Sequence, residues 1–414
     1  MAYVAVKGGE QAIGNAIELL KLSRSDGARS LEIDVIVTRM KQLVDRVMCE
    51  AGFYAPAYAA LALKQSEGSM EEAVFLMRAY RSTLSRPHTS LPIDCRDMRL
   101  TRRISSAFKD IPQGQILGPT YDYTHRLIDF HLQHETEEEL TAFRKEHYTK
   151  TGGCTSAQGG DAGEAYTGAI TNPETDAGGA AGVDASGPLM KAERVSAILK
   201  QEGVIRSYEN DDRDPDDITQ DKVMFPASRS ARLQTLFRAD TGFVSGVSYA
   251  GLRGYGFNAH PTIGELRSGY MEIEIAYPLD DRESMIVGEI PFTEVEGYFS
   301  DEISEGPEHS ALGVAIGYGL AFGRAETKAI AMSILDSALD HPHPGSPPND
   351  EEFVLLHGEA LEMSGFISHL KLPHYVTYQS KLDNIRKTRQ AGGGAKKARE
   401  TATGKGAGFG HGQE

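Results

Sequence analysis

The chain has 414 residues, of which 40% are hydrophobic and 25% are charged, and its formal net charge is −16. At ~150 residues per domain this length allows about two or three domains, and the composition is that of an ordinary globular protein. A strongly negative chain repels nucleic acid and anionic membranes, so we expect neither as a partner. A phosphate-bearing ligand therefore needs a local cluster of basic groups.

The three cysteines, Cys49, Cys95 and Cys154, have no spacing typical of metal ligands. So few cysteines favour reduced thiols over a disulfide framework. The first residues lack the pattern of a signal peptide, and no apolar run reaches the ~18 residues of a membrane span. These features predict a cytoplasmic protein.

Residues 1–148 are predicted to be mainly helical, after a short strand at residues 3–6. The helix signals are an apolar face at residues 13–20, a second at 36–47 that stops at Gly52, and a capping box of Ser69 and Glu72 before an apolar stripe at 73–84. Residues 149–189 are rich in small and polar residues and have few bulky apolar ones. Such a stretch predicts a flexible linker or insertion.

Residues 190–390 are predicted to mix strands and helices, which makes the fold class α+β. The acidic residues 208–221 lack the glycine and glutamate of a calcium loop and predict a solvated loop. Strands are expected at residues 243–249, 270–276, 285–294 and 313–322, and helices at 325–339, 351–363 and 375–389. The Gly/Lys-rich residues 391–414 predict a disordered tail.

Two Gly- and Pro-containing stretches combine charges of both signs. The first displays Lys109, Asp122, His125 and Arg126 among tyrosines, and basic side chains there could meet phosphate. A capped helix entry with polar surface groups is the alternative.

The second stretch, residues 253–270, carries Arg253, His260, Glu265 and Arg267 among glycines that allow a ligand to approach the backbone. An ordinary Gly-rich hairpin loop is the alternative.

Two further stretches are weaker signals. Residues 317–328 form a strand, a glycine turn and a helix start, but their spacing is GxGxxxG, so tight strand–helix packing is the default. His369 and His374 flank Pro373, which forbids a continuing helix. A turn there can bring the two imidazoles together as zinc ligands.

Taken together, these stretches resemble the I subunits of bacterial carbon–phosphorus lyase, from residue 3 to about residue 376. The segments that carry the resemblance are Tyr3-Val-Ala-Val-Lys-Gly-Gly-Glu10, Val44-Asp-Arg-Val-Met48, Ala60-Leu-Ala-Leu-Lys-Gln65, Lys109-Asp-Ile-Pro112, Leu117-Gly-Pro-Thr-Tyr-Asp-Tyr-Thr-His-Arg-Leu127, Arg253-Gly-Tyr-Gly256, Arg267-Ser-Gly-Tyr270 and Gly365-Phe-Ile-Ser-His-Leu-Lys-Leu-Pro-His-Tyr375. Residues 149–189 and the tail depart from the family's pattern.

The resemblance implies a specific activity. With the G, H and L proteins, such a subunit displaces the purine of ATP or GTP with methylphosphonate and yields ribose 1-methylphosphonate 5-triphosphate. Alone it is similar to a purine nucleosidase. It also implies a zinc site at His369 and His374, beside the J subunit, which is a radical S-adenosylmethionine enzyme.

Under this resemblance the candidate residues take expected roles. The triphosphate would meet Lys109, Arg126, Arg253 or Arg267. Asp122 or Glu265 would stabilise a cationic sugar while His125 or His260 protonates the purine. The sequence does not decide which of these residues performs the glycosyl chemistry. Because two imidazoles do not complete a zinc site, His369 and His374 would share the metal with the J subunit.

Two other interpretations stay open. The chain could be a scaffold whose chemistry lies in its partners, or an independent zinc hydrolase. A hydrolase would need further ligands in the same chain, and the sequence contains no HExxH or similar cluster.

Overall fold

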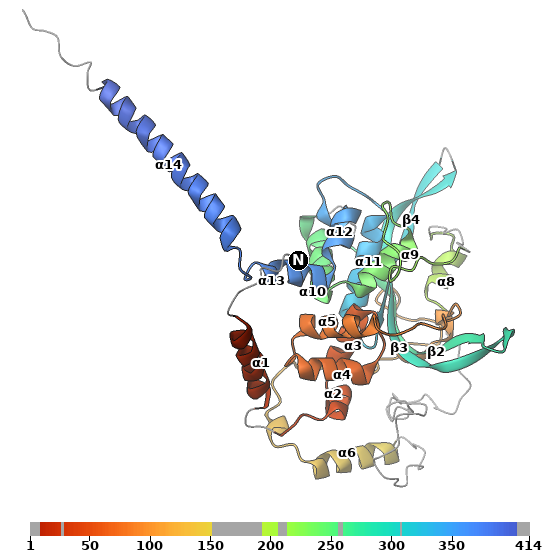
Figure 1. Ribbon diagram of the computed structural model, residues 1–414. Helices are drawn as coiled ribbons and strands as arrows, with labels where there is room; N and C mark the ends of the chain where they lie inside the picture. The colour runs from red at the N-terminus through yellow and green to blue at the C-terminus, as the bar shows by residue number, and fades with distance from the viewer. Residues whose placement is uncertain are drawn as a thin grey trace, which may run out of the picture. The chain divides into compact units, whose positions relative to one another are not determined.

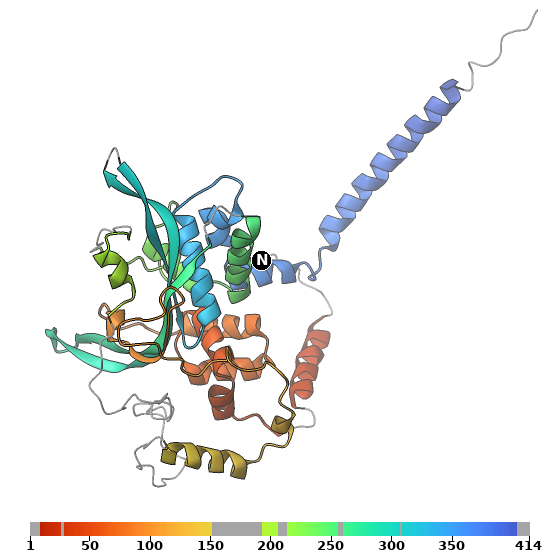
Figure 2. The ribbon, with the colours of Figure 1, turned by 180° about the vertical axis from the view of Figure 1, so that it is seen from behind.

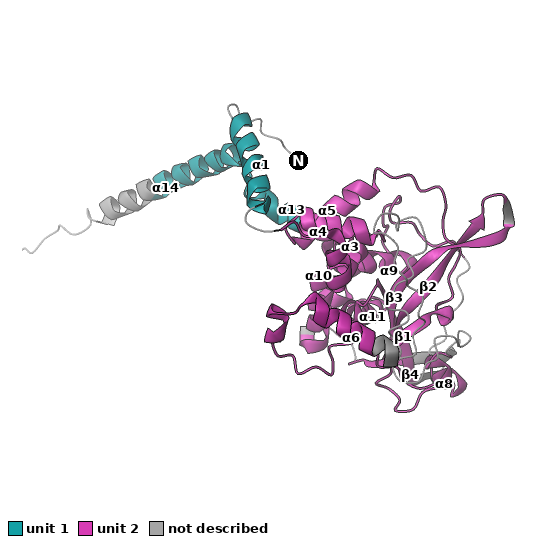
Figure 3. Ribbon diagram, turned by 90° about the horizontal axis from the view of Figure 1, so that it is seen from below, with its two compact units in different colours: residues 1–26, 362–414 teal, residues 27–361 magenta. Residues whose placement is uncertain are grey.

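The computed structural model describes residues 9–25, 29–150, 193–205, 213–255, 260–306 and 309–403. It divides into two compact units, one of Met1–Asp26 with Glu362–Glu414 and the other of Gly27–Leu361 (Figure 3). The strand predicted at residues 3–6 and the part of the predicted linker after Lys150 lie outside the described residues. None of the described helices combines the length and apolar character needed to cross a bilayer.

The N-terminal part is helical, as predicted. Its helices are α1 (Glu10–Ser25), α2 (Ile33–Arg39), α3 (Lys41–Ala51), α4 (Pro56–Gln65), α5 (Met70–Arg81) and α6 (Glu137–Lys150). Gly52 ends α3 in the left-handed conformation, with φ of 60°. The Ser69 side chain caps α5 by accepting a hydrogen bond from the Glu72 amide, which confirms half of the predicted capping box.

Helices α2 to α5 pack around one apolar core (Figure 1). This core contains Val44, Val47 and Met48 of α3, Leu63 of α4 and Met77 of α5, and all five are almost fully buried. The predicted helix over residues 36–47 is two helices, because the backbone at Met40 leaves helical geometry between α2 and α3.

Within the described residues four strands form an antiparallel sheet in chain order. They are β1 (Arg99–Ile104), β2 (Thr262–Tyr277), β3 (Asp280–Gly306) and β4 (His309–Phe322). The long β3 pairs with β2 over its first part and with β4 over its second part, and residues 292–298 pair on both sides. The strands predicted at 270–276, 285–294 and 313–322 are therefore confirmed as parts of longer strands, while β1 was not predicted.

Helix α11 (Glu326–Leu339) packs against β3 and β4, as Figure 2 shows from behind. A Cβ atom added at Gly317 would lie 2.0 Å from the Ser333 carbonyl oxygen, and one at Gly319 would lie 1.9 Å from that of Ala329. Close approach of helix and strand therefore explains these two glycines, as the simpler interpretation of residues 317–328 predicted.

The strand predicted at residues 243–249 is wrong, because this stretch forms helix α10 (Thr241–Ala250). The Asp240 carboxylate caps the helix by accepting a hydrogen bond of 2.6 Å from the Phe243 amide. Val244 and Ser248, four residues apart, are the buried face, and the Ser248 hydroxyl donates to the Ala331 carbonyl at 2.8 Å. Helical spacing and the cap therefore outweigh the strand propensity of the β-branched and aromatic residues.

The remaining helices are α8 (Ser196–Gln201), α9 (Arg229–Arg238), α12 (Glu351–His357), α13 (Ala360–His369) and α14 (Tyr375–Thr403). The helix predicted at residues 351–363 is thus split between α12 and α13. Helix α14 continues to Thr403, into the range 391–414 for which we predicted a disordered tail. The run of Ala, Lys, Arg and Glu after its three consecutive glycines favours helix.

Candidate functional site

A cavity of about 540 Å³ opens in the unit Gly27–Leu361, a volume typical of small-molecule sites. Its walls come from α2 and α3, the segment after β1, the strands β2 and β3, and the turn between β4 and α11. The lining residues are Val37, Thr38, Lys41, Val44, Asp45, Met48, Tyr54, Pro56, Thr101, Leu117, Gly118, Pro119, Ser268, Gly269, Tyr270, Pro291, Phe292, Gly323 and Arg324. The cavity thus combines basic groups, a carboxylate, hydroxyls and apolar surface.

Helix α3 presents one face to the cavity, because Lys41, Val44, Asp45 and Met48 recur with helical spacing. The Arg324 amide lies 3.2 Å from Oδ2 of Asp45 and donates a hydrogen bond to it. This contact joins α3 to the turn before α11, so two elements far apart in the chain fix the carboxylate.

Two tyrosines bring hydroxyl groups and rings to the cavity. The Tyr54 ring packs edge-on against Phe322 at 5.5 Å, and the Tyr270 ring lies 4.8 Å from the Arg99 guanidinium. Burial raises the pKa of Tyr54 to about 12, with smaller contributions from the charges of Asp45 and Tyr270. Tyr54 is therefore protonated near neutral pH and can donate a hydrogen bond.

Arg102, a buried residue of β1, holds the wall formed by residues 117–119. Its guanidinium donates to the Leu117 carbonyl, lies 2.6 Å from an Asp122 oxygen, and has Nε 2.7 Å from the Glu326 carboxylate. Gly118 has φ of +61°, and a Cβ there would lie 2.4 Å from the Thr101 carbonyl oxygen. The wall therefore depends on a glycine and on one arginine that also reaches the start of α11.

The first predicted stretch lies partly beside this wall. Asp122 is partly exposed and meets Arg102, and Arg126 lies 3.7 Å from its second oxygen. His125 and Lys109 are exposed. The structure brings Asp122 and Arg126 together, and none of these four predicted residues is among those that line the cavity.

Glu265, one of our predicted catalytic groups, lies in a fully buried ion pair. Arg103 of β1 donates from Nε to its carboxylate at 2.6 Å, and the Val195 amide donates to its other oxygen at 3.1 Å. Both side chains of the pair are 1% exposed. Glu265 therefore joins β1, β2 and the segment before α8, and it does not line the cavity.

Arg267, a predicted phosphate ligand, is also buried and paired. Its Nε donates to Glu294 of β3 at 2.5 Å, and its Nη2 donates to the Cys95 carbonyl at 2.6 Å. Its neighbours Ser268 and Tyr270 line the cavity, but Arg267 does not. In this arrangement its guanidinium links β2 to β3 and to the Cys95 backbone before β1.

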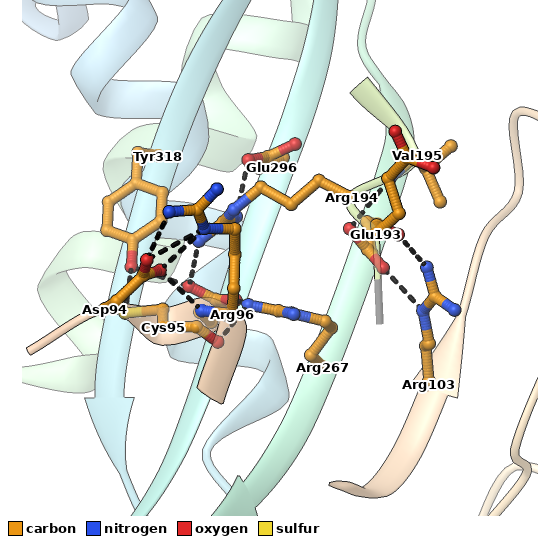
Figure 4. Close-up of polar contacts among 12 residues, drawn as sticks. Asp94, Cys95, Arg96, Arg103, Glu193, Arg194, Val195, Arg267, Glu296 and Tyr318 are labelled. Carbon is orange, nitrogen blue, oxygen red and sulfur yellow. Dashed lines mark hydrogen bonds and ion pairs between the residues drawn. The ribbon is translucent and has the colours of Figure 1, made fainter. Parts of the chain in front are cut away.

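The two pairs belong to a buried polar network, in which Arg194 reaches from the segment before α8 toward β3 (Figure 4). Arg194 donates to Glu296 at 2.5 Å and to Glu294 at 3.2 Å, and the Tyr318 hydroxyl donates to Glu294 at 2.8 Å. Burial raises the pKa of the Cys95 thiol to about 11, and the Glu294 charge adds to this shift. The network links β2, β3, β4 and the segment before α8 through buried charges, while Arg267 Nη1 and Glu296 Oε2 have no hydrogen-bond partner among the described residues.

The remaining candidates of the Gly-rich stretch are exposed. The Arg253 guanidinium lies 5.8 Å from the Tyr249 ring, and His260 Nδ1 lies 3.0 Å from the Pro261 carbonyl oxygen. Residues 256–259 between them are outside the described ranges, and neither side chain lines the cavity.

His369 and His374 lie together in the other compact unit, at the turn between α13 and α14. Their ring centroids are 5.3 Å apart and their planes meet at 58°. Nδ1 of His369 contacts the Phe366 carbonyl, and Nδ1 of His374 lies 2.6 Å from that of Leu372. Across the described ranges no group of three or more His, Cys, Asp and Glu side chains is arranged to hold a metal.

The family model of the bacterial phosphonate metabolism protein PhnI matches residues 2–392. The chain belongs to the PhnI family. It is 41% identical over 397 residues to the alpha-D-ribose 1-methylphosphonate 5-triphosphate synthase subunit PhnI of Escherichia coli K12, a match that covers 94% of this chain and 98% of that one.

Two further relatives are similar over nearly their whole lengths. A synthase subunit of the same name from Rhizobium meliloti 1021 is 38% identical over 419 residues, which cover 96% of this chain and 100% of that one. The putative C-P lyase subunit protein HtxH of Stutzerimonas stutzeri is 39% identical over 396 residues, which cover 94% and 96%.

Three segments that carried the resemblance converge on the cavity of this PhnI-family chain. Residues 44–48 supply Asp45, residues 117–127 supply the wall at Gly118, and residues 267–270 supply Ser268 and Tyr270. Asp45 was not predicted from the sequence, because it lies within an apolar helical repeat that we interpreted as core. The sequence does contain one signal for this residue, because its carboxylate lies on the same helical face as the apolar Val44 and Met48.

Proposed function

We propose that this chain is a subunit of an alpha-D-ribose 1-methylphosphonate 5-triphosphate synthase that serves the catabolism of organic phosphonates. The names of two relatives, at 41% and 38% identity, support this proposal. Such a product has methylphosphonate on the anomeric carbon of a ribose that keeps its 5-triphosphate. A purine nucleoside triphosphate, ATP or GTP, is the donor we propose, with G, H, J and L proteins as partners.

The cavity is the site we propose for the ribose and its phosphates. The observation that carries this proposal is the convergence of three family-matched segments, residues 44–48, 117–127 and 267–270, on one hollow that also contains Lys41 and Arg324. Two cations supply the local positive charge that phosphate needs on a chain of net charge −16. Tyr54 and Tyr270 offer rings and hydroxyls to the sugar or base.

The candidates from sequence keep narrower roles in this proposal. Asp122, His125 and Arg126 follow the cavity wall directly in the chain, so we propose them for the rim of the site. Glu265 and Arg267 each form a buried ion pair, so we propose that they position the strands and do not contact the substrate. Lys109, Arg253 and His260 stay predictions for contacts with phosphates or with the leaving purine.

The zinc proposal rests on the two histidines at the turn after α13. Both Nδ1 atoms contact backbone carbonyls, which favours the tautomer whose Nε2 lone pair can bind a metal. The ring separation of 5.3 Å is compatible with a shared ion. Because zinc normally takes four ligands, we propose that His369 and His374 share it with a side chain of the J subunit.

The cavity proposal is tested by ATP binding and purine release. In the complex assembled with the partner subunits, Lys41→Ala should weaken ATP binding by about 1.5–3 kcal/mol if the ammonium makes a charged hydrogen bond to phosphate. Lys200→Ala is the matched control, because Lys200 is an exposed helical lysine that does not line the cavity.

Calorimetry measures the dissociation constant and chromatography measures free purine. If Lys41→Ala and Arg324→Ala both bind ATP and release purine as the wild type does, the cavity is not the site. If a complete wild-type complex releases no purine, the scaffold interpretation replaces the enzymatic one.

A further inference from the structure

We propose that Asp45 is the carboxylate that faces the anomeric carbon in this cavity and stabilises the positive charge that develops on the sugar. The inference rests on the proposed function and adds a catalytic residue to it. Asp45 lies on α3, in contact with the turn that leads from β4 into α11.

The composition of the cavity favours Asp45 for this role. Among the lining residues of the described chain, Asp45 alone carries a carboxylate. Breaking a glycosidic bond places positive charge on the anomeric carbon and ring oxygen, and a fixed negative charge stabilises it in a site from which water is excluded. If a carboxylate of this cavity performs that task, it is Asp45.

The turn at Gly323 leaves space for the Asp45 side chain. A Cβ atom added at Gly323 would lie 2.0 Å from the Asp45 carboxylate carbon and from Oδ2, so only glycine allows the carboxylate to lie there. Gly323 also has φ of +62°, which other residues adopt at a cost. The glycine turn predicted from sequence therefore admits the acidic side chain of Asp45.

The charge of Asp45 acts within the cavity. Asp45 receives a backbone amide, and its charge raises the pKa of Tyr54 in addition to the larger effect of burial. Its field therefore reaches another group of the same cavity.

In the step we propose, a phosphonate oxygen forms a bond to the anomeric carbon as the bond from that carbon to the purine nitrogen breaks. The electron pair of the broken bond leaves with the purine. The proton lost by the phosphonate hydroxyl balances the proton that the purine nitrogen gains. Asp45 stays ionised throughout and opposes the transient positive charge of the sugar.

Asp45 also has a structural role, because it accepts a hydrogen bond from the Arg324 amide just before α11. Asp45→Asn separates the two roles. The amide oxygen of asparagine can still accept that hydrogen bond, while the negative charge is removed. A role in capping alone predicts unchanged kinetics.

The experiment measures purine release and ATP binding in the assembled complex. We expect Asp45→Asn to lower kcat by about 10²–10³ and to leave the dissociation constant of ATP within about threefold, since the charge acts mainly in the transition state. An Asp45→Asn variant with the kcat of the wild type would overturn the assignment while leaving the proposed function intact. A wild-type complex that releases no purine would overturn both.

Gly323→Ala is the second variant, which displaces the carboxylate without removing its charge. We expect it to lower kcat in the same direction, and it decides the matter if Asp45→Asn does not fold. Gly68→Ala is its matched control, because Gly68 has φ of +86° and nothing within 4 Å of an added Cβ. Equal kcat values for the Gly323 and Gly68 variants would contradict the proposal.

Discussion

Replacing Glu265 by glutamine should unfold the protein at a lower temperature and leave its chemistry unchanged. The variant keeps the shape of the side chain but removes its charge, so Arg103, 1% exposed, is left without its counter-ion. Removing one partner of a buried ion pair typically costs about 3–5 kcal/mol. For a unit of this size that loss lowers the unfolding midpoint by roughly 5–10 °C.

Thermal unfolding followed by circular dichroism measures this effect, and purine release is measured well below the lowered midpoint. Glu289→Gln is the matched control, because Glu289 pairs with Arg99 at 2.6 Å where both side chains are about a third exposed. Such a pair contributes about 0–1 kcal/mol. An unchanged midpoint in Glu265→Gln together with lost purine release would refute the structural role and restore the catalytic one.

Three other predictions concern a glycine of β4, the Cys95 thiol and the histidine pair after α13. Gly319→Ala should lower the free energy of unfolding by about 1–3 kcal/mol, because its Cβ would lie 1.9 Å from a carbonyl oxygen of α11. Gly288→Ala is the control and should leave the free energy of unfolding nearly unchanged, because an added Cβ there has nothing within 4 Å. Denaturant titrations measure both values. The folded chain holds the Cys95 proton more tightly than the unfolded chain, because burial raises the pKa of the thiol to about 11. This contribution to stability is complete below the pKa of the unfolded thiol and is lost as the pH rises toward 11. Urea titrations across that pH range measure the change in stability, and mass spectrometry of iodoacetamide-labelled peptides measures the reactivity of Cys95. The complex with partner subunits should contain zinc that the His369→Ala/His374→Ala double variant lacks in elemental analysis, and stoichiometric zinc on the isolated chain would contradict a shared site.

Local signals in the sequence predicted most of the helices and three of the four described strands. Ser69 and Gly52 act at close range through a cap and a left-handed turn, so their effects can be inferred from neighbouring residues. The strand predicted at residues 243–249 was wrong because we did not recognise such a local signal. The helix there is fixed by the Asp240 cap and by packing against α11, and we gave more weight to strand propensity.

The candidate site was predictable only in part, because its charges are paired across long stretches of chain. Glu265 and Arg267 looked like ligands for a substrate, but Arg103 lies 162 residues before Glu265 in the chain, and no local pattern joins them. The turn at Gly323 was recognised from its glycines. Its occupant, Asp45, lies on a helix 279 residues before Arg324, and only the folded chain brings them together.

The cavity also determines how any occupant affects folding. Its lining runs from Val37 to Arg324, so helices, strands and the turn before α11 must all be in place before it exists. A partly folded chain that lacks any one of these walls gains nothing from the ligand. An occupant at a hundred times its dissociation constant therefore adds about 2.7 kcal/mol to the stability of this whole unit. The bound molecule therefore stabilises only chains in which residues 37–324 have been synthesised and folded.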